Sequence, residues 1–150
     1  MKQTYLETIL LIERLHRRFL DVIKSELDRL HFDDVNNVQT LILYNIGADQ
    51  LTVGELTNRG YYLGTNVSYN VKNLVQSGYL IQEKAPHDKR STRVKLSEKG
   101  QALVGKMDEL IERNVDELNK QNPGLAELAE TNKSMHRLER FWTEYMNRLY

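Results

Sequence analysis

Apolar positions along the chain follow two different spacings, which predict helices and one hairpin. Residues 2–30 carry apolar side chains at three- and four-residue steps, the spacing of one long helix. The same spacing predicts helices over 38–46 and 65–77, one that begins after Ser97, and a last one from Pro123 to the C-terminus. We expect the last helix to bend or fray at its polar segment, residues 130–134.

Two segments near the middle of the chain are predicted to pair as strands. Residues 93–96 alternate strictly between polar and apolar side chains, which is typical of a strand with one buried face. Residues 79–84 are the expected partner, and the polar loop 85–92 between them contains Pro86. The sequence therefore predicts a hairpin with a cationic tip.

A helix-turn-helix is predicted immediately before this hairpin. In "LTVGEL", residues 51–56, the Thr52 hydroxyl and the Glu55 side chain can form a capping box that starts a short helix, which ends at Gly60. The helix 65–77 follows after a tight glycine-containing turn and ends at Gly78. The expected fold is mostly α with a small β-hairpin wing (α+β), that is, a winged helix-turn-helix flanked by long helices.

Composition adds an uneven charge distribution to this picture. The 150 residues have a formal net charge of zero, yet residues 51–100 hold eight Lys/Arg against four Asp/Glu. A basic centre of this kind indicates a polyanionic partner. No apolar run approaches the ~20 residues of a membrane span, so we expect a soluble, cytoplasmic protein with no membrane partner.

The sequence shows no pattern that indicates an enzyme, a metal site or a bound cofactor. The chain has no cysteine, which excludes disulfides and thiolate chemistry. Its four histidines are scattered without metal-ligand spacing, and it has no phosphate-binding glycine loop or nucleophile elbow. We therefore expect a binding protein.

The wing carries a recognisable motif. "DKRSTRVKLSEKG", residues 88–100, resembles the wing of MarR-type transcriptional regulators, and residues 51–82 resemble their helix-turn-helix. The wording "YYLGTNVSYNVKNLV", residues 61–75, is also similar to a subgroup linked to L,D-transpeptidase and cell-envelope genes. The resemblance implies a single MarR-like domain over 1–150, with dimerisation helices at 1–34 and 97–150 and the winged DNA-binding part at 36–96.

This resemblance also implies a homodimer that binds a pseudo-palindromic site in double-stranded DNA. The residues agree, because the long end helices have more apolar positions than one small winged domain can bury. Trp142, Phe141 and Tyr150 suit an interface. The alternative is that these helices form the core of a monomer.

The helix 65–77 is the predicted reading helix. Of the candidate DNA-binding residues, Thr65, Tyr69, Lys72 and Asn73 lie opposite its apolar residues, and Asn66, Ser68 and Asn70 lie on the shoulders. The three asparagines are suited to adenine edges, which favours an A·T-rich site. Ser68 and Lys72 suit phosphates, and Tyr69 a phosphate or a thymine methyl. Many members of the family carry arginine near the position of Tyr69, so no operator sequence can be borrowed from them.

Four residues of the wing complete the predicted DNA-binding surface. Arg90, at the tip beside Lys89, is expected to enter the minor groove, where negative potential favours arginine. Asp88 can hold the guanidinium of Arg90 or Arg93 in a fork geometry. The alternative is an ordinary solvated hairpin.

The family often binds small aromatic or anionic effectors between the dimerisation helices and the winged part. By position, the resemblance implies His16, Phe19, His31 and Tyr44 as pocket residues. We expect a homodimeric repressor of transcription that is released by such a ligand. The alternative from another class is a winged-helix module that binds protein, which predicts an apolar or acidic reading face.

Overall fold

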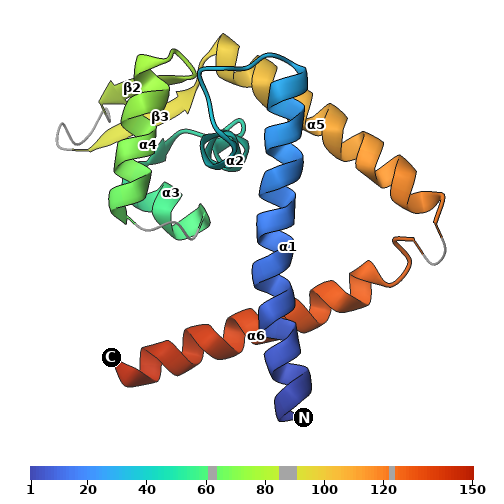
Figure 1. The fold of residues 1–150 in the computed structure, drawn as a ribbon. Coiled ribbons are helices and arrows are strands. Elements are labelled where there is room, and N and C mark those ends of the chain that lie inside the picture. The colour runs from blue at the N-terminus through green and yellow to red at the C-terminus, as the bar shows by residue number, and fades with distance from the viewer. Residues whose placement is uncertain (61–63, 85–90, 122–123) are drawn as a thin grey trace. The chain divides into compact units, whose positions relative to one another are not determined.

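The computed structural model describes the backbone of residues 1–60, 64–84, 91–121 and 124–150, and their side chains except at 59, 60, 64 and 65 (Figure 1). The elements are, in order, α1 (Lys2–Arg29), α2 (Asn37–Ile46), β1 (Leu51–Thr52), α3 (Val53–Gly60), α4 (Gly64–Gln76), β2 (Leu80–Lys84), β3 (Thr92–Leu96), α5 (Glu98–Asn119) and α6 (Leu128–Leu149). The chain is mostly helical with one small antiparallel sheet, which confirms the predicted fold class.

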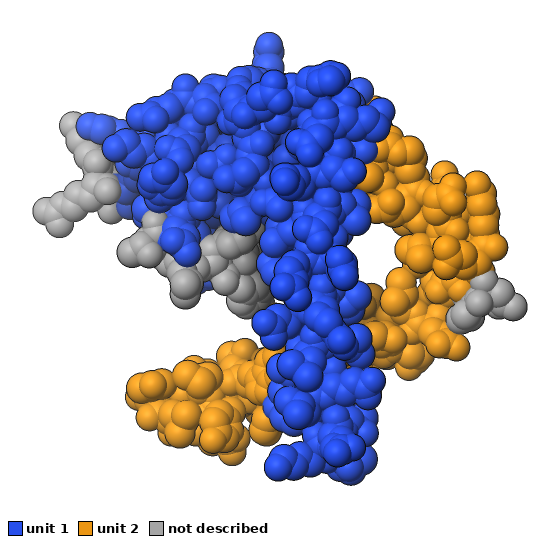
Figure 2. All heavy atoms as spheres, in the orientation of Figure 1, with its two compact units in different colours: residues 1–108 blue, residues 109–150 orange. Residues whose placement is uncertain are grey.

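These elements form two compact units, residues 1–108 and 109–150 (Figure 2). The first holds α1 to α4, the sheet and the first turns of α5, and the second holds the rest of α5 and α6. The predicted division, with dimerisation helices at 1–34 and 97–150 and a winged part at 36–96, is a division by role and stays a prediction.

The sheet has the strand order β1-β3-β2, with both pairings antiparallel. β2 pairs with β3 from Leu80 opposite Leu96 to Lys84 opposite Thr92, which confirms the predicted hairpin pairing. β1 was not predicted, because two residues are too few to show an alternation. Thr52 belongs to this strand and its hydroxyl also accepts the Glu55 amide at 3.1 Å, which is the first of the two bonds of the predicted capping box.

The core of residues 1–108 lies between α2, α4, the sheet and the start of α5. Its buried apolar side chains come from α1, α2, α3, α4, all three strands and α5: Ile23, Leu27, Ile42, Leu43, Ile46, Leu51, Leu56, Val67, Val71, Leu74, Leu80, Val94, Leu96, Leu103 and Met107. The alternation in β3 has the expected result, since Val94 and Leu96 are buried while Arg93 is exposed.

The last helix differs from its prediction in two ways. α6 begins at Leu128, five residues later than expected, and it runs without interruption through residues 130–134. The polar segment was expected to interrupt the helix, but its side chains bond along the helix instead. The Thr131 hydroxyl donates to the carbonyl oxygen of Glu127 at 3.1 Å, and Lys133 pairs with Glu130 at 2.9 Å.

Both end helices expose apolar side chains in the single chain. α6, all of whose residues are described, buries none of them. Its exposed apolar side chains are Leu128, Phe141, Tyr145, Met146 and Leu149, and those of α1 are Tyr5, Leu6, Leu10, Leu11, Ile12, Leu15, Phe19 and Val22. Exposure on this scale is unusual for a monomeric soluble protein.

Two glycines of α5 have opposite surroundings. Gly100 is buried, and a Cβ there would collide with the carbonyl oxygen of Tyr79 and lie 3.3 Å from Cδ2 of Leu96. Gly105 is exposed, and a Cβ there would meet no atom within 4 Å. The first glycine is required by the close approach of α5 to the α4–β2 junction, whereas packing does not require the second.

This contrast gives a prediction for stability. Gly100→Ala should lower the free energy of unfolding by about 1–3 kcal/mol, because the backbone of Tyr79 must move to make room for the methyl group. Gly105→Ala is the matched control in the same helix, and it should raise the free energy of unfolding by about 0.5–1 kcal/mol through helix propensity alone. Urea unfolding measures both, and equal effects at the two positions would contradict the close approach.

Candidate nucleic-acid interface

α4 has one face in the core and one in solvent. Val67, Val71 and Leu74 are buried against the unit, and Val75, predicted on the same face, is partly buried. Four of the predicted DNA-contacting residues are exposed on the other side: Asn66, Ser68, Tyr69 and Lys72. Tyr69 stands furthest out, with 67% of its surface exposed. Asn73 is partly buried at the edge, and the side chain of Thr65 lies outside the described residues.

Asn70 differs from the other asparagines of α4. Its side-chain carbonyl oxygen accepts a hydrogen bond from Nε2 of Gln39 at 3.2 Å. Its amide nitrogen donates to the carbonyl oxygen of Asn66 at 2.8 Å. Both ends of the amide are therefore engaged within the protein, so Asn70 must give up these bonds before it can read a base.

Gln39 is a residue that the sequence analysis did not identify. It is the third residue of α2, where it completes a capping box: Asn36 Oδ1 accepts the Gln39 amide at 2.8 Å, and Gln39 Oε1 accepts the Asn36 amide at 3.1 Å. Its Nε2 then reaches α4, and the residue is buried. The Asn36–Gln39 spacing indicates the cap, but the contact with Asn70 is 31 residues away and leaves no mark on the sequence.

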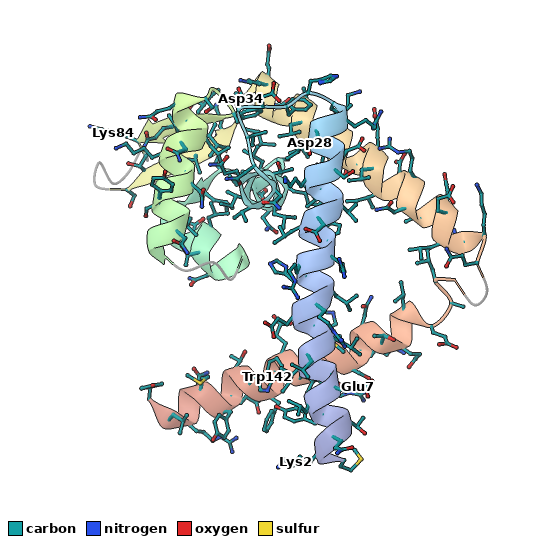
Figure 3. The ribbon with its side chains drawn as sticks, viewed as in Figure 1. Lys2, Glu7, Asp28, Asp34, Lys84 and Trp142 are labelled. Carbon is teal, nitrogen blue, oxygen red and sulfur yellow. The ribbon has the colours of Figure 1, made fainter. Side chains whose placement is uncertain are left out.

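The described part of the wing presents cations on an exposed surface. Arg93 is exposed on β3, and Lys84 lies at the outer end of β2 with its side chain directed away from the unit (Figure 3). Lys95 pairs with Glu83 across the two strands at 2.9 Å. The predicted tip residues Asp88, Lys89 and Arg90 lie outside the described residues, so their roles stay predictions.

A cavity of about 720 Å³ opens beside the winged part. Its lining comes from the end of α2, the segment 47–50, β3 and the start of α5. The Tyr44 hydroxyl donates to Oδ1 of Asp108 at 3.0 Å across the lining. This hydrogen bond to a carboxylate raises the pKa of Tyr44, so the hydroxyl remains a donor at neutral pH.

Of the four residues predicted to line an effector pocket, only Tyr44 lines this cavity. His16 and Phe19 are exposed on α1. His31 follows α1 with a φ of +61°, and the next amide, that of Phe32, donates to the carbonyl oxygen of Leu27 at 3.0 Å. His31 therefore occupies the left-handed position that ends a helix, where glycine is usual.

Metal ligands and membrane-spanning helices are both missing from the described ranges. No three histidine or acidic side chains within those ranges gather closely enough to hold a metal ion. None of the helices described there has the length and apolar character needed to cross a membrane.

Comparison with known proteins gives one family throughout. The MarR family model matches residues 33–91. The exopolysaccharide II synthesis transcriptional activator ExpG of Rhizobium meliloti (strain 1021) is 35% identical over 139 residues, which cover 93% of this chain and 72% of ExpG.

Solved structures share the fold at lower identity. Streptococcus pneumoniae FabT in complex with DNA has a TM-score of 0.74 and 18% identity, covering 94% of this chain and 99% of FabT. Staphylococcus aureus MarR in complex with salicylate and kanamycin has a TM-score of 0.74 and 20% identity, covering 95% of this chain and 93% of that one.

The hydrogen bond between Gln39 and Asn70 predicts that substitutions at these two residues have coupled effects on stability. Asn70→Ala should lower the free energy of unfolding by about 1 kcal/mol, because it leaves the buried Nε2 of Gln39 without its acceptor. In the double variant that also carries Gln39→Met, the change in the free energy of unfolding should differ from the sum of the two single changes by at least about 0.5 kcal/mol. Urea unfolding of the two single variants and the double variant measures this coupling.

Asn73→Ala is the matched control, since the Asn73 side chain forms no hydrogen bond with any described residue. It should leave the free energy of unfolding within about 0.5 kcal/mol of the wild-type value. If Asn70→Ala were as neutral as Asn73→Ala, the contact would have no part in holding α4.

Proposed function

Because this chain belongs to the MarR family of transcriptional regulators, we propose that it acts as a homodimer that binds a pseudo-palindromic DNA site through α4 and the wing and responds to a small-molecule effector. One observation carries the proposal. α4 buries an apolar face and presents Asn66, Ser68, Tyr69 and Lys72 outward, beside a hairpin with exposed cations. A helix of this kind enters the major groove while the wing contacts the adjacent backbone or minor groove.

Sequence preference depends on which side chains are available to bases. Asn66 is exposed, and Asn73 lies at the edge of the same face. Both are suited to adenine, which supports an A·T-rich half-site. Asn70 is bonded within the protein, so its first role is to hold the helix and not to read DNA. Lys72 and Ser68 would position the helix on phosphates.

The exposed apolar side chains of α1 and α6 support the homodimer. Burial of apolar surface drives most protein association, and α6 buries none of its residues in the single chain. A symmetric dimer presents its two reading helices to half-sites about one helical turn apart.

The direction of regulation has two candidates. Repression is the first candidate, because a dimer that occupies a promoter blocks polymerase. The family resemblance favours this direction. Activation is the second candidate, because ExpG, at 35% identity, is an activator of exopolysaccharide synthesis. The position of the binding site relative to the promoter decides between them.

The cavity beside α5 is the proposed effector site. It would place a ligand against Tyr44, Leu96 and Val104. Two carboxylates, those of Asp49 and Asp108, and one ammonium group, that of Lys95, also line it. Of the two effector classes that the family resemblance implies, an aromatic one therefore suits the lining better than an anionic one. The salicylate-bound structure of Staphylococcus aureus MarR supports small-molecule binding on this fold.

The exposed face of α4 disfavours the alternative of a protein-binding module. Such a module predicts an apolar or acidic face. The exposed residues among the described side chains of α4 are instead polar, cationic or a tyrosine: Asn66, Ser68, Tyr69, Lys72 and Gln76.

Selection of duplex DNA from a random pool at physiological salt tests the function. We expect enrichment of an A·T-rich inverted repeat with half-site centres about 10 base pairs apart. Light scattering on the same sample should give the mass of a dimer. A folded protein that enriches no sequence would contradict the proposal and favour the protein-binding alternative.

Arg90→Ala tests the wing. It should weaken binding to every duplex and reduce the slope of log affinity against log salt by about 0.9 for each of the two cations that a dimer loses. Lys120→Ala is the charge-matched control, because Lys120 is an exposed cation paired with Glu117 at 3.3 Å and far from α4 in the sequence. An unchanged slope for Arg90→Ala would remove this residue from the interface.

A further inference from the structure

We propose that Asp34, Tyr79 and Lys99 form a clamp that fixes the C-terminal end of α4 to the start of α5, and that this clamp sets the orientation in which α4 meets DNA. The three are positioning residues, because none belongs to the exposed face of α4. The inference rests on the proposed function, since it requires α4 to read DNA.

The end of α4 is built as a Schellman motif. Gly78 has a φ of +84°. The amide of Tyr79 donates to the carbonyl oxygen of Leu74 at 2.9 Å, and that of Gly78 donates to Val75 at 3.1 Å. Tyr79 and Leu74 are both fully buried, and they occupy the two positions where an apolar contact frequently accompanies this motif. The motif itself supplies no donor for the carbonyl groups of Ser77 and Gly78.

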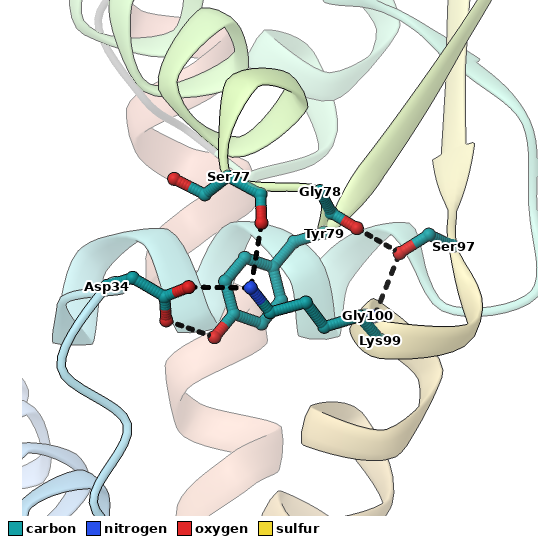
Figure 4. Close-up of polar contacts among 7 residues, drawn as sticks. All are labelled: Asp34, Ser77, Gly78, Tyr79, Ser97, Lys99 and Gly100. Atoms are coloured by element: carbon teal, nitrogen blue, oxygen red, sulfur yellow. Dashed lines mark hydrogen bonds and ion pairs between the residues drawn. The ribbon is translucent and has the colours of Figure 1, made fainter.

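Ser97, the residue before α5, and Lys99 in its first turn supply those donors (Figure 4). Nζ of Lys99 donates to the carbonyl oxygen of Ser77 at 2.8 Å, and the Ser97 hydroxyl donates to that of Gly78 at 2.5 Å. A cation at the C-terminal end of a helix also opposes the negative end of the helix dipole. The start of α5 therefore completes the end of α4.

Asp34 brings a third segment, the one between α1 and α2, to the same point. Its Oδ1 accepts a hydrogen bond from the Tyr79 hydroxyl at 2.5 Å, and its Oδ2 accepts one from Nζ of Lys99 at 2.6 Å. Nζ of Lys99 also lies 4.3 Å from the centre of the Tyr79 ring. As Figure 4 shows, one carboxylate bridges the two side chains that hold the end of α4.

The charge states of two clamp residues, Asp34 and Tyr79, are fixed at neutral pH. The hydrogen bond from Lys99, and after it that from Tyr79, lowers the pKa of Asp34. Burial, and then the bond to Asp34, raises the pKa of Tyr79, so its hydroxyl stays a donor. The Lys99 and Asp34 side chains are 45% and 49% exposed, and an ion pair this accessible adds little to stability. Its directional bonds therefore matter more for placement than for unfolding.

Contacts of α4 with base edges and contacts with phosphates respond differently to a change in the orientation of the helix. Contacts to base edges need the helix held to a fraction of an ångström, whereas phosphate contacts carry no sequence information and tolerate small shifts. A loosened clamp should therefore lower the preference for the operator and leave non-specific binding in place.

Binding of the full chain to its selected operator and to an unrelated duplex tests the clamp. Tyr79→Phe removes only the hydroxyl, and Lys99→Met removes the cation. Each variant should lose about tenfold in affinity for the operator and less than about twofold for the unrelated duplex, with an unchanged salt slope. Lys120→Met, which makes the same charge change as Lys99→Met, should keep the wild-type preference.

A second readout does not use DNA. The chain has no cysteine, so Gln76→Cys at the last residue of α4 gives one spin-label site per protomer. The distance distribution between the two labels of a dimer should be broader in the Tyr79→Phe background than in the wild-type background.

The outcomes separate the clamp from the proposed function. A wild-type protein that prefers no duplex would overturn the proposed function and the clamp's role together. A wild-type protein that discriminates, with Tyr79→Phe and Lys99→Met variants that discriminate equally well and keep a narrow label distribution, would overturn the clamp alone. Equal losses of affinity for the operator and the unrelated duplex would also overturn the clamp alone. A reduced operator preference with a broadened distribution is the result expected.

Discussion

The arrangement of α4, the sheet and α5 depends on one buried residue, Tyr79. Its amide closes the last turn of α4 through Leu74, and its carbonyl oxygen accepts the amide of Ser97, the residue before α5, at 3.0 Å. Its ring fills the core, and its hydroxyl reaches Asp34. The same carbonyl oxygen lies where a side chain on Gly100 would be, so α5 can approach only with glycine there.

The spacing of apolar residues in the sequence predicted the buried faces of α4 and β3. It gave no sign of polar contacts between residues that are far apart in the sequence. The apolar steps of 65–77 predicted which side of α4 is buried, and the alternation of 93–96 predicted the buried side of β3. The strand at Leu51–Thr52 was missed because two residues have no period. Asp34 is 45 residues from Tyr79 and 65 from Lys99, and in the sequence it is one more polar residue in a turn.

The asparagines of α4 have two different environments, which residue type alone does not distinguish. Asn66 and Asn70 have the same side chain and lie one turn apart, yet the first is exposed and the second is bonded to Gln39. A side-chain amide with both ends engaged is costly to free, because each lost bond must be replaced. α4 is thus held at its middle by α2 and at its end by the proposed clamp, while its outer face stays exposed.

α5 connects the proposed clamp with the proposed effector cavity. Its residues Gln101, Val104, Gly105 and Asp108 line the cavity at the spacing of one helix face, while Lys99 faces the end of α4 and Leu103 is buried in the core. A helix is stiff over two turns, so a ligand that shifts one face of α5 must also move Lys99 relative to Ser77. Gly105 leaves the cavity face open at a cost in helix propensity that packing does not explain. A ligand that approaches the backbone at Gly105 would give that cost a function, and the proposed route from ligand to α4 would then be the less than two turns of α5 that separate Gly105 from Lys99.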